Sequence, residues 1–169
     1  MILCCTKKLI NAYGLSVVEN FTNNKTFSEW YANLIYIEKK KCILFTESKT
    51  LFSIILLDLK KSDIINIGEL FYKQLYRSLL QIGIKEDLIK SIVPKELKIL
   101  YSTTQDKRIL GSMNDYAYQY KHIILAKGWI GYIDIDGIIQ NINETPMSLI
   151  GYNSANRLVR MVILNENFA

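Results

Sequence analysis

The fold is decided by residues 30–57, WYANLIYIEKKKCILFTESKTLFSIILL, which hold three apolar runs separated by the short polar segments EKK and ESK. The runs are WYANLIYI (30–37), KCILFT (41–46) and TLFSIILL (50–57). Connections this short join antiparallel neighbours, so the stretch predicts a three-stranded meander. Both faces of the first run carry apolar side chains, and we therefore expect helices to cover at least part of each face.

Helical periodicity follows Lys61. A helix capped by Ser62 or Asp63 is predicted, with Gly83 placed to end it. Its buried positions are expected to be Ile67, Leu70, Phe71, Leu75, Leu79 and Ile82. The later predicted elements are a helix at 85–93 that stops at Pro94, a strand near 97–103, a long helix at 106–127 that stops at Gly128, and helices near 133–143 and 154–164. Asp134 or Asp136 is expected to cap the N-terminus of the helix near 133–143.

The pattern as a whole predicts an α+β fold in a single domain, residues 1–169. Residues 1–60 are expected to be mainly strands, beginning with ILCCT (2–6), with a loop or short helix at 11–28. Residues 61–169 are expected to be mainly helices with one strand. The prediction is thus an N-terminal antiparallel meander of three to five strands packed against four or five helices. Half of the residues are hydrophobic, which indicates a real core and excludes general disorder.

Cysteine usage and hydropathy bear on the compartment. Cys4, Cys5 and Cys42 form no spaced disulfide framework, which favours a reducing environment. MILCCTKKL (1–9) places its lysines after the apolar run, the reverse of a signal peptide, and no segment approaches the roughly 20 apolar residues of a spanning helix. We therefore expect a cytoplasmic protein without membrane contact. One histidine and three scattered cysteines lack zinc-site spacing, so no metal site or cofactor is expected.

The long predicted helix carries the main candidate site. Arg108, Ser112, Asp115, Gln119 and His122 recur at helical spacing and form one polar stripe. One interpretation is an ordinary polar helix face; the other is a pocket near the helix N-terminus, where free N–H groups favour an anion. The candidate cleft comprises Arg108, Ser112, Asn114, Asp115, His122 and Thr145.

A second candidate feature is basic. The net charge is +5, although the 17 lysines and 4 arginines also suit plain solubility. Candidate anion contacts are Lys7, Lys8, Lys40 and Lys41. The last two lie in a predicted strand turn near Trp30, Tyr31 and Tyr36, and lysines interleaved with aromatics can hold single-stranded nucleic acid. A lysine-rich turn can equally be a solvated tip that discourages edge-strand aggregation.

Several strings together resemble a known family. They are CTKKL (5–9), WYANL (30–34), KCILFT (41–46), TLFS (50–53), GSMNDYAY (111–118) and TPMSLIGY (145–152). In this order they resemble a family of small bacterial proteins catalogued as a domain of unknown function. The resemblance covers residues 1–152 and leaves 153–169 outside. It implies a stand-alone prokaryotic protein and points to accessory or mobile genes, but it brings no established activity with it. This chain has NETPM where an arginine often precedes the threonine in that family.

These observations leave several functions open. The leading hypothesis is a cytoplasmic binding or interaction module whose partner is nucleic acid or protein, and a homo-oligomer is a further alternative. The second hypothesis is a small metal-assisted hydrolase or nuclease that uses Asp115 with Arg108 or His122. The sequence contains no phosphate-loop glycine pattern, dinucleotide fingerprint or nucleophile-elbow motif, which argues against the enzymes that carry those motifs.

Overall fold

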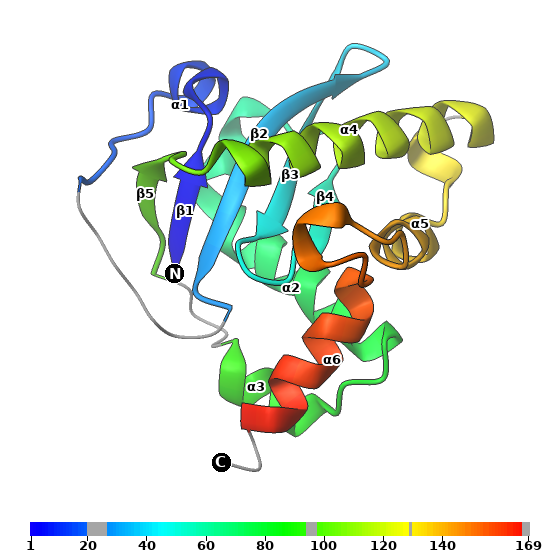
Figure 1. Cartoon of the computed structure of the whole chain (residues 1–169). Coiled ribbons are helices and arrows are strands. Elements are labelled where there is room, and N and C mark those ends of the chain that lie inside the picture. Colours follow the sequence, from blue (N-terminus) through cyan, green and yellow to red (C-terminus); the bar gives the residue numbers. More distant parts are fainter. Residues whose placement is uncertain (20–26, 94–97, 129, 167–169) are drawn as a thin grey trace.

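The computed structural model describes residues 1–19, 27–93, 98–128 and 130–166 (Figure 1). Part of the segment 11–28, and Pro94 and Leu97 from the predicted helix end and strand, lie outside this description. The strands are β1 (Ile2–Cys5), β2 (Glu29–Ile37), β3 (Lys40–Glu47), β4 (Ser53–Leu56) and β5 (Leu100–Thr103). The helices are α1 (Lys7–Tyr13), α2 (Ile67–Gln81), α3 (Glu86–Ile92), α4 (Lys107–Lys127), α5 (Ile135–Asn143) and α6 (Ala155–Glu166), with 3-10 turns η1 (Lys61–Asn66), η2 (Ile130–Tyr132) and η3 (Ser148–Ile150).

The strands form one mixed sheet in the order β4-β3-β2-β1-β5. The predicted meander is confirmed, because β2, β3 and β4 pair antiparallel in sequence order. The prediction of a wholly antiparallel sheet is wrong. β1 lies between β2 and β5 and runs parallel to both, with Leu3 paired to Trp30 on one side and to Tyr101 on the other. No turn connects these partners, so local sequence did not reveal the pairing.

A helix interrupts the predicted strand region. Lys7 and Lys8, which follow the predicted strand ILCCT (2–6), begin α1, whose N-terminus is capped by the Thr6 hydroxyl accepting from the Leu9 N–H at 3.4 Å. Parallel strands require a crossover connection, and α1 lies in the connection from β1 to β2. With α1, the described residues hold six α-helices rather than four or five. The broad α+β prediction is confirmed.

Helices cover both faces of the sheet, as expected. Figure 1 shows α4 crossing one face and α2 lying against the other. On the α2 face, the Phe71 ring packs edge-on against Trp30 and Phe45, with centroids 4.9 Å and 5.0 Å apart. On the α4 face, the Tyr31 hydroxyl accepts from the Asp106 N–H at 3.1 Å. Alternating side chains of the central strands are therefore buried on both sides.

The long helix forms as predicted. α4 begins after Asp106, whose carboxylate accepts from the Arg108 N–H at 2.8 Å, and ends at Gly128. Its apolar face packs inward: Ile109, Met113, Tyr116, Tyr120 and Ile124 are buried, while Leu110 and Ala117 are half-buried. Asp134 caps α5 by accepting from the Gly137 N–H, which confirms that prediction.

Helix α2 begins later than predicted. The preceding residues form the 3-10 turn η1, in which the Asp63 carboxylate accepts from the Lys60 N–H at 2.7 Å. Asp63 thus caps a tighter turn, and the regular helix starts only at Ile67. Its end agrees with the sequence, because Gly83 adopts φ +85°, a conformation that glycine reaches without strain.

Candidate functional site

The candidate cleft residues on α4 lie in different environments. Arg108 is exposed and pairs with the Asp106 carboxylate, with Nη2 2.7 Å from Oδ2. Ser112 is buried with the apolar face of the helix, so the predicted polar stripe is interrupted there. Asn114 and Asp115 are both exposed. The predicted polar stripe on α4 therefore contains one buried residue, Ser112, and several exposed ones.

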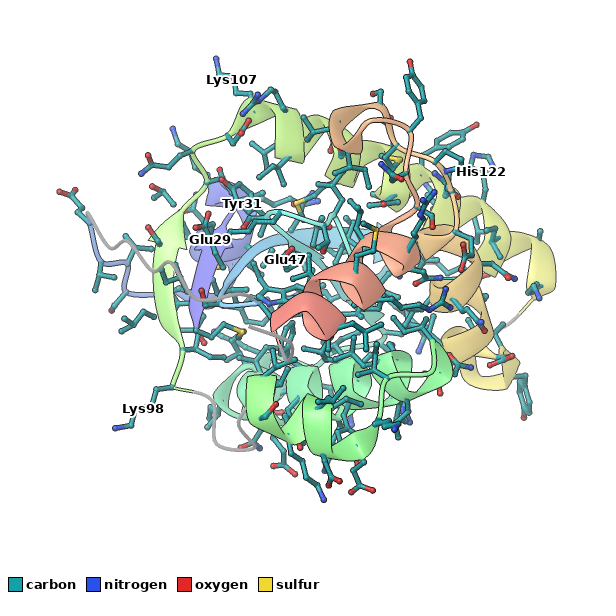
Figure 2. The ribbon with its side chains drawn as sticks, turned by 60° about the horizontal axis from the view of Figure 1, so that its bottom comes forward. Glu29, Tyr31, Glu47, Lys98, Lys107 and His122 are labelled. Atoms are coloured by element: carbon teal, nitrogen blue, oxygen red, sulfur yellow. The ribbon has the colours of Figure 1, made fainter. Side chains whose placement is uncertain are left out.

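The remaining cleft residues have other partners. His122 is exposed (Figure 2). Its ring lies against that of Tyr118, with the two centroids 4.1 Å apart. The Thr145 hydroxyl donates to the Gln119 side-chain oxygen at 3.2 Å. Among the residues that the structure describes, no hydrogen bond or ion pair joins any two of the six cleft candidates. A shared role for the six stays a prediction.

Metal and thiol chemistry find little support in these surroundings. Within the described ranges, no group of three or more His, Cys, Asp or Glu side chains could hold a metal ion. Burial raises the pKa of both Cys4 and Cys5 to about 12, so each thiol keeps its proton at neutral pH. A thiolate is the form that attacks electrophiles and binds soft metals. Both cysteines are buried in β1.

The sheet topology gathers basic residues at one end. β1, β2, β4 and β5 all point in one direction, because β1 is parallel to β2 and β5 while β3 runs antiparallel to both β2 and β4. The segments that follow these four strands therefore meet at the same end of the sheet. We call this the basic end. Its basic side chains are Lys7, Lys8, Lys39, Lys40, Lys41, Lys60, Lys61, Lys107 and Arg108, and its acidic ones are Glu38, Asp58, Asp63 and Asp106.

Direct contacts tie the segments of the basic end together. The Leu59 N–H donates to the Lys41 carbonyl at 2.8 Å, which joins the segment after β4 to the start of β3. The Lys40 ammonium pairs with Asp58. On the other side, the Thr6 hydroxyl donates to the Asn33 side-chain oxygen at 3.0 Å. These contacts join the segments that follow β1, β2 and β4.

Two tyrosines lie among these lysines. The Lys8 ammonium sits 4.7 Å from the centre of the Tyr36 ring, and the Lys41 ammonium sits 5.6 Å from that of Tyr13. Tyr36 is 45% exposed. Cation–π contacts of this kind orient a lysine without neutralising its charge. The positive charge therefore stays available to an anionic partner.

Acidic residues reduce this positive charge only in part. Asp106 is held by Arg108, whose guanidinium and N–H lower the pKa of that carboxyl to about 2. Asp58 is engaged by Lys40 and Asp63 by the Lys60 N–H. Each of these three carboxylates is thus already engaged by a group of the basic end itself. The excess of lysines over carboxylates at this end is a net positive charge.

The four candidate anion contacts from the sequence are all part of the basic end. Sequence reasoning missed Lys60, Lys61 and Lys107 as members of the same surface. A signal was present, because a lysine pair or a Lys-Arg pair closely follows β1, β2, β4 and β5. The direction of the strands, which brings those pairs together, was not visible in the sequence.

The comparisons agree with the strings noted in the sequence. The model of a domain of unknown function, DUF6933, matches residues 2–158. The chain belongs to this family. The DUF6933 match runs past residue 152, where the resemblance ended, to residue 158, so the exclusion of 153–158 was wrong. No curated protein and no solved structure matches the sequence significantly. DUF6933 membership names the domain and brings no activity with it.

Hydropathy adds one finding on the helices. None of those in the described part of the chain is both long enough and apolar enough to cross a membrane.

Proposed function

We propose that this DUF6933 protein is a nucleic-acid-binding module and that the basic end is its binding surface. The observation that carries the proposal is the shared direction of β1, β2, β4 and β5, which collects the basic segments at one end of the sheet. Each lysine that neutralises a phosphate releases a condensed counterion, so a continuous basic surface favours a polyphosphate backbone.

The dimensions and chemistry of the surface fit such a partner. Five strands at a spacing of about 4.8 Å make the sheet end roughly 19 Å wide, which is long enough for several consecutive phosphates. Tyr36 offers an exposed aromatic surface beside Lys8, where an unpaired base could stack. The proposal also includes the cytoplasmic location, supported by Cys4, Cys5 and Cys42, which are all free.

The experiment measures binding of fluorescently labelled single-stranded and duplex DNA of equal length by fluorescence anisotropy. Affinity should fall steeply between about 50 and 200 mM salt. In the double variant Lys8→Gln/Lys107→Gln, the slope of log K against log salt should become shallower by about 0.9 for each duplex phosphate that the variant no longer neutralises. The same change should weaken the binding of all sequences uniformly.

A matched control uses the opposite end of the sheet. Lys49 lies in the turn after β3 and Lys98 just before β5, so both are far along the strands from the basic end. Figure 2 shows Lys98 and Lys107 projecting at opposite ends of the segment that contains β5. Lys49→Gln/Lys98→Gln removes the same charge and should bind like the wild type. Equal losses of affinity in both double variants, or no salt-dependent binding at all, would refute the proposal.

The same samples discriminate the alternatives. If DNA is degraded when Mg²⁺ is added and Asp115→Ala abolishes the degradation, the hydrolase hypothesis replaces the binding module. If DNA is neither bound nor cleaved, the basic end serves another partner and the proposal fails.

A further inference from the structure

A cavity of about 470 Å³ lies far from the basic end in the fold, between the turn that follows α2, the beginning of α3 and the helix α6. Its walls include Ile84, Lys85, Asp87, Leu88, Arg160 and Leu164. The volume falls within the range of about 300–1,000 Å³ that small-molecule sites occupy. The cavity is therefore large enough for a ligand of several carbon atoms.

The floor and sides of the cavity are aliphatic. Ile84 is buried and joins the cavity to the core, and Leu88 is half-buried. Leu164 is 45% exposed, so much of an aliphatic side chain on α6 faces water. Covering such surface is favourable by the hydrophobic effect. An unbranched hydrocarbon chain would be the matching occupant.

Two cations stand at the walls of this aliphatic cavity. The Arg160 Nε donates to the Ile82 carbonyl at 2.8 Å, which holds the guanidinium against the end of α2. Among the described residues, neither the terminal nitrogens of Arg160 nor the Lys85 ammonium has an ion-pair partner. Asp87 is the one acidic wall residue, so cations outnumber carboxylates around the cavity. This balance favours an anionic group over a cationic one.

We propose that this cavity binds a small anionic amphiphile, a single aliphatic chain that ends in a carboxylate. The chain would lie against Ile84, Leu88 and Leu164, and the carboxylate would meet Arg160 and Lys85. Arg160 and Leu164 lie beyond the residues that the DUF6933 model matches. The site is independent of nucleic-acid binding at the basic end.

The test is a titration of the isotope-labelled protein followed by NMR, with decanoate as the probe. Decanoate should bind saturably and shift the amide signals of residues 84–88 and 160–164. Decylammonium, which has the same chain length and the opposite charge, should bind at least roughly tenfold more weakly. Butyrate, which retains the carboxylate and lacks the long chain, should not saturate.

Variants of the wall residues test the contributions of the carboxylate and of the aliphatic chain of decanoate separately. Arg160→Gln should weaken decanoate binding roughly tenfold, while Arg157→Gln, an exposed arginine on the same helix that is not a wall residue, should leave it unchanged. Leu164→Ser should weaken decanoate and decylammonium alike. Should Arg160→Gln fail to fold, Lys85→Gln takes its place with the same expectation.

Three results would overturn the site. They are decanoate binding that never saturates, shifts that map away from the cavity, and decylammonium binding as tightly as decanoate. Wild-type affinity in both Arg160→Gln and Lys85→Gln would equally contradict the proposed role of the cations.

Discussion

Glu47 is a carboxylate almost entirely removed from water, with 1% of its surface exposed. Its Oε2 atom accepts from the Lys49 N–H at 3.0 Å, from the Thr50 N–H at 2.7 Å and from the Thr50 hydroxyl at 2.8 Å. These bonds hold the turn between β3 and β4. Burial nevertheless outweighs them and raises the pKa of Glu47 above its ordinary value.

This raised pKa predicts a pH dependence of stability. Because the folded chain binds this proton more tightly than the unfolded chain does, the contribution of Glu47 is fully present below the unfolded-state pKa of 4.5. It is lost as pH rises through the raised pKa. The free energy of unfolding of the wild type, measured relative to that of Glu47→Gln, should therefore decrease as pH rises from about 4 to 8.

Urea unfolding at a series of pH values measures that difference. The control is Glu38→Gln, which removes an exposed carboxyl from the turn between β2 and β3. A pH-independent difference for Glu47→Gln would contradict the assignment of burial as the dominant effect.

At the scale of elements, the edge strand β4 is held by a side chain of α5. The Asn143 amide is fully buried and imitates a neighbouring strand: its Oδ1 accepts from the Ser53 N–H and its Nδ2 donates to the Ser53 carbonyl, each at 2.7 Å. The same Nδ2 also donates to the Ile139 carbonyl. One side chain thus satisfies both outward backbone groups of Ser53.

Asn143→Ala should lower the free energy of unfolding by about 3 kcal/mol, because the buried Ser53 N–H would lose its partner and the Ser53 carbonyl would keep only the Tyr120 hydroxyl at 3.4 Å. Chemical denaturation measures the change. Asn141→Ala, on the exposed side of the same helix, should change stability by less than about 0.5 kcal/mol. A similar small effect at Asn143 would show that water or another group replaces the amide.

The elements predicted from sequence are those with a strong local signal. The meander follows from short turns, and α4 from the spacing of Ile109, Met113, Tyr116, Tyr120 and Ile124. α1 was missed, because it has only seven residues and only Leu9 is fully buried. A helix with one buried side chain leaves almost no periodicity to detect. The equally short α3, in which only Ile89 is buried, was predicted because Pro94 follows it in the sequence and marks its end.

At the scale of the whole molecule, β1, β2 and β3 form the centre of the sheet. They have neighbours on both edges and buried side chains on both faces. Their amide hydrogens should therefore exchange with solvent only through global unfolding, while those of α3, on the periphery, should exchange through local opening. Hydrogen–deuterium exchange followed by NMR tests this order. Exchange in β1 as fast as in α3 would contradict it.

The basic end also depends on the arrangement of the whole molecule. For this reason the sequence predicted only some of its lysines. Lys7 and Lys8 could be proposed from their type and position. Their nearness to Lys60 and Lys107 depends on the parallel pairing of β1 with β5 and on the direction of β4. Such long-range pairings are set by packing over the whole molecule and leave no local pattern.

The place of β1 between β2 and β5 has a consequence for synthesis on the ribosome. β1 ends at Cys5, but its second neighbour begins only at Leu100. At about 5–20 residues per second, translation leaves one hydrogen-bonding edge of this apolar strand without its native neighbour for roughly 5–20 s. During that interval the nascent polypeptide offers an open edge to other chains, so its yield should depend on elongation speed and on chaperone supply.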